Sequence, residues 1–159
     1  MNAKNIAYWF ITIVLAFCIL SGGAAEALHY QANVDGIVMR LGYPLYFLTL
    51  IGIWKVLGAI VILVPRLPRL KEWAYAGIFF NVTGAAFSHA AVGDYGVYAF
   101  HVLINLFFAA LVIASWALRP SGRVVGEVLA SATPQRRAAS LRREFAGAKG
   151  KPATAPAGR

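Results

Sequence analysis

The sequence is poor in cysteine and in charged residues, and both shortages limit what the protein can be. A single cysteine, Cys18, excludes an internal disulfide, a CxxC redox pair and a cysteine-based zinc site. Only 13% of the residues are charged, well below the roughly 25% that is usual in soluble domains. The sequence also lacks internal repeats, a phosphate-binding glycine loop and a recognisable hydrolase motif. These shortages argue against a soluble enzyme of a common class.

Hydrophobic residues, by contrast, make up 60% of the chain, and most of them fall into four long runs. Each run is close to the about 20 residues that an α-helix needs to cross a hydrocarbon core of about 30 Å. Tryptophan and tyrosine gather near the ends of the runs, as expected for aromatic belts at the two membrane interfaces. The sequence therefore predicts an all-α integral membrane protein, a four-helix transmembrane bundle. The predicted spans are residues 6–23, 44–64, 73–92 and 97–118.

The distribution of basic residues predicts the orientation of these spans. The loop between the second and third spans holds Arg66, Arg69 and Lys71, whereas the other two loops hold one basic residue between them. Residues 1–118 carry a net charge of +2, and residues 119–159 carry +7. Because lysine and arginine stay on the cytoplasmic side, both termini are predicted to lie in the cytoplasm. The basicity belongs to a tail and not to a folded face, so nucleic acid is not a predicted partner.

The chain divides into a transmembrane domain, residues 1–118, and a basic cytoplasmic tail, residues 119–159, which is predicted to be largely disordered. Two amphipathic patterns lie outside the spans. The first predicts a short helix on the membrane surface, and the second is a tail segment that either rests on anionic lipid or is solvated. The first consists of Val34, Ile37, Val38 and Leu41, and the second of Ala138, Leu141 and Phe145 beside four arginines.

The first apolar run admits a second interpretation, as a cleaved signal peptide. Lys4, an apolar stretch and the triplet Ala25-Glu26-Ala27 match the order of such a segment. However, residues 6–23 are longer than a usual signal-peptide core, and three further spans already commit the chain to the bilayer. A retained first span is the favoured interpretation.

The clearest functional signal is a lysine in the middle of the second span. A lysine at the centre of a transmembrane helix costs roughly 2.5–3.5 kcal/mol on insertion scales, so it normally faces the bundle interior and has a partner. Lys55 holds this position, and Gly52 and Ala59 share its helix face. Because small residues let another helix approach closely, Lys55 is predicted to be sheltered by a neighbouring span.

The third and fourth spans each carry one polar face at helical spacing. From the topology, Lys55 and Asn81 lie roughly 16 Å from the outer end, and Asn105 lies roughly 12 Å from it. His89 and His101 lie only about 5–6 Å deep. The sequence thus predicts a polar cavity that opens outward and ends near the midplane. The candidate ligand-binding residues are Glu26, which lies just beyond the predicted first span, Lys55, Asn81, Ser88, His89, His101 and Asn105.

Structural roles remain open for most of these side chains. Asn81 and Asn105 are equally consistent with hydrogen bonds that hold helices together, and each histidine alone is more often a packing residue than a ligand. Two histidines and Glu26 at similar depth are compatible with a metal, but the linear spacing matches no dense ligand motif. No metal site is therefore predicted, and no residue is assigned a catalytic role.

Six short stretches within residues 41–94 stand out: Leu41–Pro44, Lys55–Gly58, Pro65–Trp73, Gly84–Ala85, Ser88–His89 and Gly93–Asp94. Together they resemble the DoxX-like family of small bacterial membrane proteins, so the inner membrane of a bacterium is the expected location. The resemblance implies a four-helix membrane bundle, and it marks Lys55 and His89 as recurrent positions. The family is named after a subunit of a thiosulfate to quinone oxidoreductase, but most members have no assigned reaction. The position of Asn81 is often acidic in similar proteins, which makes a proton relay through the third span less expected here.

Two functions from different classes follow. The first is a redox-associated membrane subunit that binds a quinone or another apolar, carbonyl-bearing molecule in the cavity. Lys55 would polarise an oxygen, and His89 or His101 would exchange a proton. The second is non-catalytic: a membrane chaperone or a component of a small-solute transporter. Lipid is a predicted partner in both, with a membrane redox partner or a second copy of the chain as further candidates.

Overall fold

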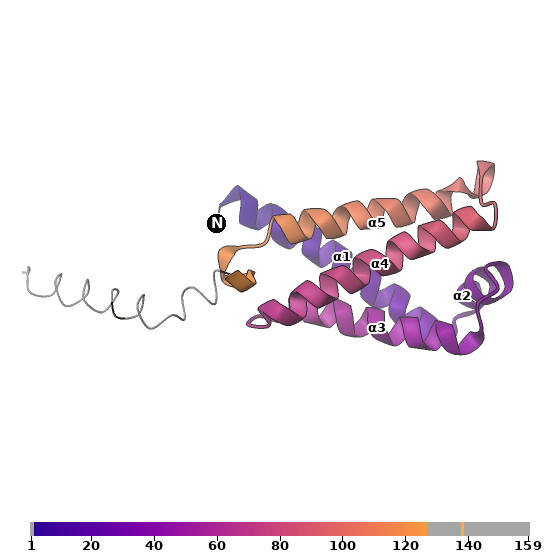
Figure 1. The fold of residues 1–159 in the computed structure, drawn as a ribbon, viewed down its shortest axis with the longest axis horizontal. Coiled ribbons are helices and arrows are strands. Elements are labelled where there is room, and N and C mark those ends of the chain that lie inside the picture. Colours follow the sequence, from indigo (N-terminus) through magenta and orange to yellow (C-terminus); the bar gives the residue numbers. More distant parts are fainter. Residues whose placement is uncertain (1, 127–137, 139–159) are drawn as a thin grey trace, which may run out of the picture.

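A computed structural model describes residues 2–126 and residue 138, and these residues form helices and connecting turns without any β-strand. The four long helices run back and forth along the molecule (Figure 1). The predicted basic tail lies outside the described residues from 127 onward, apart from Ala138. The long helices are α1 (Ala3–Ala27), α3 (Leu45–Leu63), α4 (Pro68–Ala91) and α5 (Ala99–Ala117).

Three of these helices, α1, α3 and α5, are long and apolar enough to cross a membrane. Three of the four predicted spans are therefore confirmed in length and composition. Helix α4 is also long, at 24 residues, but it is less apolar because it begins with three charged side chains and carries several polar ones. The predicted span over residues 73–92 falls on α4 and remains a prediction. The boundaries of the other helices agree with the expected spans to within a few residues, except at the end of α1.

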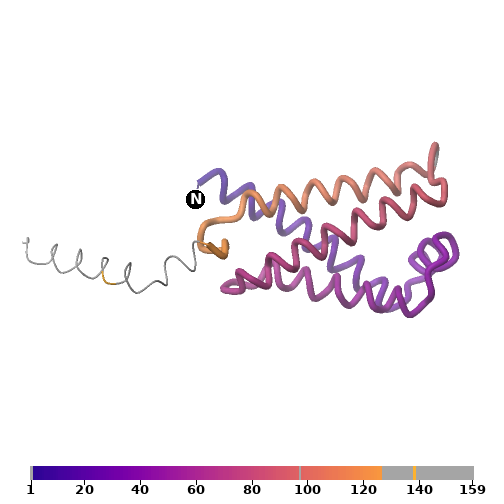
Figure 2. Tube along the Cα trace, viewed as in Figure 1, coloured from indigo at the N-terminus to yellow at the C-terminus, as the bar shows by residue number. Residues whose placement is uncertain are grey.

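The long helices associate as two main pairs. Helix α1 packs most extensively against α3, and α4 packs against α5 as an antiparallel hairpin. Figure 2 shows α1 passing behind the hairpin, so that its first turns lie near the end of α5 and its last turns lie near the start of α3. We call the end at which α4 and α5 join the Asp94 end, and the opposite end, at which α3 and α4 join, the Lys71 end.

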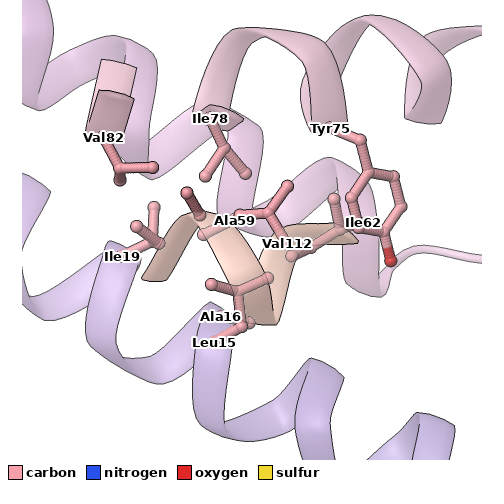
Figure 3. Packing of buried hydrophobic residues seen from close by; sticks show 10 residues of the cluster. Leu15, Ala16, Ile19, Ala59, Ile62, Tyr75, Ile78, Val82 and Val112 are labelled. Carbon is pink, nitrogen blue, oxygen red and sulfur yellow. The ribbon is translucent and has the colours of Figure 1, made fainter. Parts of the chain in front are cut away.

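One hydrophobic core joins the two pairs (Figure 3). Its buried residues come from all four long helices, and all of them except Leu15 and Tyr75 are small or β-branched. A short polar chain crosses the same interior, where the hydroxyl of Ser115 lies 2.7 Å from both the Thr12 and the Tyr75 hydroxyls. The core residues are Leu15, Ala16, Ile19, Ala59, Ile62, Tyr75, Ile78, Val82, Ala109 and Val112.

Between α1 and α3 the chain forms a helical excursion at the Asp94 end. It consists of α2 (Gln31–Asn33) and the π-helix η1 (Val34–Arg40), followed by Gly42 in the left-handed region. A helix was predicted here from apolar residues spaced for 3.6 residues per turn. The helix forms, but its wider π-helical turns do not preserve that spacing. Two short 3₁₀ turns, η2 (Gly96–Tyr98) and η3 (Ser121–Arg123), precede and follow α5.

At the Lys71 end, basic side chains cap the last turn of α3. The ammonium of Lys71 is fully buried and donates to the carbonyls of Val61 and Ile62, at 2.7 and 2.6 Å. Arg123 donates to the carbonyls of Ile62 and Leu63 and to the Tyr8 hydroxyl. Because the last carbonyls of a helix lack intrahelical partners and carry partial negative charge, these cations stabilise the end of α3.

The buried ammonium of Lys71 leads to a prediction for the pH dependence of stability. Burial, and then the charges of Arg123 and Arg119, lower the pKa of Lys71 from 10.5 to about 8 in the folded state. The unfolded chain therefore binds more protons between pH 8 and 10.5, so stability should rise across this window. We expect the melting temperature of the detergent-solubilised protein to increase from pH 8 to 10 more steeply than that of Lys71→Met. Parallel pH profiles for the two proteins would contradict this expectation.

Candidate functional site

Lys55 lies in a buried ion pair with Glu26. Its ammonium nitrogen is 2.5 Å from Oε1 of Glu26, which is only 4% exposed, and the Lys55 side chain itself is 19% exposed. The other carboxylate oxygen, Oε2, is buried and has no hydrogen-bond partner among the described residues. Lys55 is therefore sheltered by α1, as its position in the sequence suggested. Glu26 retains one acceptor atom for a further hydrogen bond.

The position of Glu26 differs from the sequence-based expectation. The first span was predicted to end at Gly23, with Glu26 just beyond it. In the structure α1 continues to Ala27, so Glu26 belongs to the last turn of the helix. The four additional residues are almost all alanine, which has the highest helix propensity, so the helix continues past the two glycines. As a result the carboxylate reaches the lysine in the second half of α3.

Two glycines bring the backbones of α1 and α3 together beside this pair. A Cβ atom placed on Gly23 would lie 2.6 Å from the Lys55 Cβ and 2.8 Å from the Gly52 carbonyl oxygen. A Cβ atom on Gly52 would lie 2.5 Å from the Ala27 nitrogen. Each glycine precedes its charged residue by three positions, and residues at this spacing share a helix face. The close contact thus positions the carboxylate and the ammonium opposite each other.

An apolar groove of about 740 Å³ lies between α3 and α4, with Lys55 in its wall. The lining contains one charged side chain, that of Lys55, and one amide side chain, that of Asn81. Most of the remaining surface is hydrocarbon or aromatic. Trp54, Trp73 and Phe80 are exposed along the groove. The lining residues are Ile51, Trp54, Lys55, Leu57, Gly58, Val61, Leu70, Trp73, Ala74, Gly77, Ile78, Phe80 and Asn81.

A second polar cluster at the Asp94 end is centred on a fully buried carboxylate. Asp94 accepts from Nε of Arg40 at 2.8 Å on Oδ1, and the Arg40 Nη2 forms an ion pair with the same oxygen. Oδ2 lies 2.6 Å from Nδ1 of His89. Hydrogen bonding to Arg40 and then to His89 outweighs burial and lowers the pKa of Asp94 to about 2. The carboxylate is therefore ionised and connects η1 to the end of α4.

The backbone explains why Asp94 reaches His89. Gly93 follows α4 with a φ of +79°, in the left-handed region that glycine adopts without a Cβ penalty. The Asp94 amide then donates to the His89 carbonyl at 3.0 Å, and the Gly93 amide donates to that of Ala90. These bonds turn the chain back over the last helical turn in the manner of a Schellman motif. The side chain of Asp94 is thereby directed towards the imidazole of His89.

His101 of α5 completes this cluster. Its ring stacks on that of His89, with centroids 4.9 Å apart and an interplanar angle of 14°. Its Nδ1 lies 4.0 Å from Oδ2 of Asp94 and 3.2 Å from the Tyr98 carbonyl oxygen. The guanidinium of Arg40 lies over the Tyr98 ring, 4.1 Å from its centroid. Side chains from η1, α4, η2 and α5 therefore meet around one carboxylate.

The structure distributes the seven predicted ligand-binding residues over more than one place. Glu26 and Lys55 form the ion pair, and Asn81 lines the groove with Lys55. His89 and His101 belong to the Asp94 cluster, and within residues 2–126 no hydrogen bond or ion pair joins this cluster to the Glu26–Lys55 pair. The remaining two predicted residues form other bonds: the Ser88 hydroxyl lies 2.9 Å from that of Tyr43, and the Asn105 amide donates to the His101 carbonyl at 2.7 Å.

Sequence reasoning missed Asp94 and Arg40 as members of a site. Arg40 counted only as the one basic residue of the outer loops, and Asp94 appeared only in the Gly93–Asp94 stretch of the resemblance. The available signal was local: a glycine that ends a helix, followed by an aspartate five residues after a histidine. The partner of Asp94 in η1 is 54 residues away in sequence, and no spacing rule connects the two.

These features define a helical membrane protein with a buried ion pair beside an apolar groove. The chain matches the model of the DoxX-like family over residues 10–115, and it belongs to that family. The resemblance identified from the sequence is thus confirmed. No curated protein and no solved structure shows a significant match to the chain.

Proposed function

We propose that the chain crosses the bacterial inner membrane four times, with α4 as the third span in sequence order and both termini in the cytoplasm. The charges support this topology, because Arg66, Arg69 and Lys71 lie at the Lys71 end, together with Arg119 and Arg123. The three charged side chains that make α4 less apolar lie in its first turns. From Trp73 onward the charge-free part of α4 is long enough for a span.

We propose further that the protein is a redox-associated membrane subunit that binds a quinone, or a similar apolar molecule with a carbonyl group, in the α3–α4 groove. The observation that carries this proposal is a lysine, held by a buried carboxylate, in the wall of an otherwise apolar groove. A volume of about 740 Å³ falls within the range of roughly 300–1,000 Å³ typical of small-molecule sites. An apolar lining with few convergent polar groups suits a ring that carries two carbonyls.

The ion pair supports specific roles for its two residues. An ammonium has three donors, and Glu26 uses one of them, so Lys55 can donate another to a ligand carbonyl. Glu26 does not line the groove, so its role is to hold and orient the ammonium. A bound quinone supplies two-electron chemistry, and the electrons would come from a partner protein. In this proposal the proton exchange first considered for His89 or His101 moves to Lys55, because Lys55 lines the groove and neither histidine does.

Quinone binding can be tested by blocking the groove without breaking the ion pair. Gly77 lines the groove, and a Cβ atom there would meet nothing within 4 Å, so Gly77→Leu should fill the space without a backbone clash. We expect at least tenfold weaker binding of a short-chain benzoquinone, measured as quenching of tryptophan fluorescence, because Trp54 and Trp73 lie in the lining. Lys55→Ala should weaken binding as well, and it should reduce quinone-linked oxidation in membranes.

Gly84→Leu is the matched control. Gly84 lies two turns further along α4, has the same free space and does not line the groove, so this variant should bind the benzoquinone like the parent protein. Equal quenching in the parent, Gly77→Leu and Lys55→Ala proteins would exclude the groove as a quinone site.

A non-catalytic function is the second candidate, and the exposure of the groove favours it. Trp54, Trp73 and Phe80 are 65%, 78% and 70% exposed, so the groove is accessible along its side as well as at its ends. A membrane chaperone or a transporter component would use such an opening to hold a partner helix or a solute. A crosslinker at position 55 would then capture a partner segment, and the purified protein would show neither quinone binding nor turnover.

A further inference from the structure

We propose that His89, His101 and Asp94 form a binding site for one divalent transition-metal ion such as Zn²⁺ at the Asp94 end. One ligand atom from each of the three residues lies within 4.8 Å of those of the other two. Two imidazoles and one carboxylate are a ligand set used for zinc and for non-haem iron, and both metals tolerate open positions for water. The site is separate from the α3–α4 groove and does not depend on the function proposed for it.

Hydrogen bonds from Arg40 already orient the Asp94 carboxylate for metal binding. Asp94 is fully buried, and Arg40 binds it mainly through Oδ1, with Nε at 2.8 Å from Oδ1 and 3.1 Å from Oδ2. Oδ2 is the oxygen directed towards the histidines. Metal-binding carboxylates are commonly oriented by a hydrogen bond to their other oxygen. Arg40 would supply that bond, and its side chain is 36% exposed, so solvent screens part of its charge from the metal.

Of the two distances from Oδ2 of Asp94 to a histidine Nδ1, one is shorter than a metal site requires and the other is longer. Bonds of about 2.0–2.1 Å in a tetrahedral site place neighbouring ligand atoms about 3.3 Å apart. Nδ1 of His89 is now closer to Oδ2 than this, at 2.6 Å, as expected for an N–H that donates to a carboxylate, and Nδ1 of His101 is further away, at 4.0 Å. In the metal-bound form the ion replaces the proton shared between His89 and Asp94. The two distances from Nδ1 to Oδ2 then each change by less than about 1 Å.

One side chain must turn for the ion to bind. The two imidazole rings are nearly parallel, and an ion in the plane of one ring does not lie in the plane of the other. His101 is free to make this change, because its side chain is 45% exposed and its one hydrogen bond in the described residues, to the Tyr98 carbonyl, is 3.2 Å long. The same exposure provides a path of entry for the ion.

The test is metal binding by the full-length protein in detergent after treatment with a chelator. We expect isothermal titration with Zn²⁺ to give one site per chain, and Co²⁺ to give the visible absorption bands of a site with nitrogen ligands. His101→Ala should weaken Zn²⁺ binding at least tenfold, while far-ultraviolet circular dichroism and the elution volume stay unchanged. His101→Gln serves as a second variant if His101→Ala does not fold.

The third histidine of the chain provides a matched control. His29 is exposed and bonds to the Thr49 hydroxyl at 2.6 Å, and it does not belong to the cluster, so His29→Ala should bind Zn²⁺ like the parent protein. No Zn²⁺ binding by the parent protein would overturn the proposal. It would also be overturned if the His101 variants kept full affinity, or if His29→Ala lost it.

Discussion

Replacing Lys55 with methionine is expected to lower the free energy of unfolding by about 3 kcal/mol. This value is the lower end of the range for removing one partner of a buried ion pair. Methionine fills a similar volume, so the loss reports the charge and not the packing. The expected cause is the carboxylate of Glu26, which is 4% exposed and would be left buried without its ammonium partner. The lower end applies because the Lys55 side chain is 19% exposed and solvated in part. Unfolding by increasing fractions of sodium dodecyl sulfate in mixed micelles measures this difference.

The double variant Glu26→Gln with Lys55→Met separates the pair from its surroundings. Because no charge remains buried, the double variant should recover most of the stability that Lys55→Met loses. Additive losses in the two single variants and the double variant would mean that the two side chains do not interact in the folded protein. The ion pair requires the double variant to be destabilised by less than the sum of the two single variants.

Gly52→Ala is expected to destabilise the protein by about 1–3 kcal/mol, although alanine is normally the better helix former. A Cβ atom on Gly52 would lie 2.5 Å from the Ala27 nitrogen and 2.6 Å from the Gly23 carbonyl oxygen. Both neighbours are backbone atoms, so the two helices must separate to admit a methyl group. The same separation would lengthen the contact between Glu26 and Lys55. Denaturation in mixed micelles again provides the measurement.

Gly22→Ala is the corresponding control, because it lies next to Gly23 on α1 and a Cβ atom there would meet nothing within 4 Å. This change should leave the stability unchanged or raise it by up to about 1 kcal/mol, the ordinary gain of a helical glycine to alanine change. Equal effects of the Gly22 and Gly52 substitutions would show that the close approach of α1 and α3 is not what requires glycine.

The helices of this protein are largely predictable from the sequence because hydrophobicity and length act locally. The apolar runs coincide with α1, α3 and α5 to within a few residues, and the aromatic residues bound them. The end of α1 was wrong because the first span was ended at Gly23, whereas packing against Gly52 favours a continuous helix there. A glycine can end a helix, or it can lie within a helix and let another helix pack closely against it.

The site was predicted less completely because its contacts depend on how distant helices cross. The cost of a buried lysine predicts that Lys55 has a partner, but only the crossing of α1 and α3 selects Glu26. Helical spacing aligned Asn81 and Ser88 on one face of α4, with His89 just beside it, yet it could not show that the groove and the Asp94 cluster lie apart. The partner of Asp94 comes from η1, a π-helix that the pattern at 3.6 residues per turn does not describe.

The distance in sequence between Glu26 and Lys55 has a consequence for biogenesis. The ribosome adds twenty-eight residues after Glu26 before it adds Lys55, whose ammonium neutralises the carboxylate. Either charge alone in the hydrocarbon core is costly, so the first hairpin is expected to leave the translocon as a unit and not one helix at a time. In the nascent chain, the acidic end of α1 would stay at the polar surface until α3 arrives, which makes α3 the helix that commits α1 to its final depth.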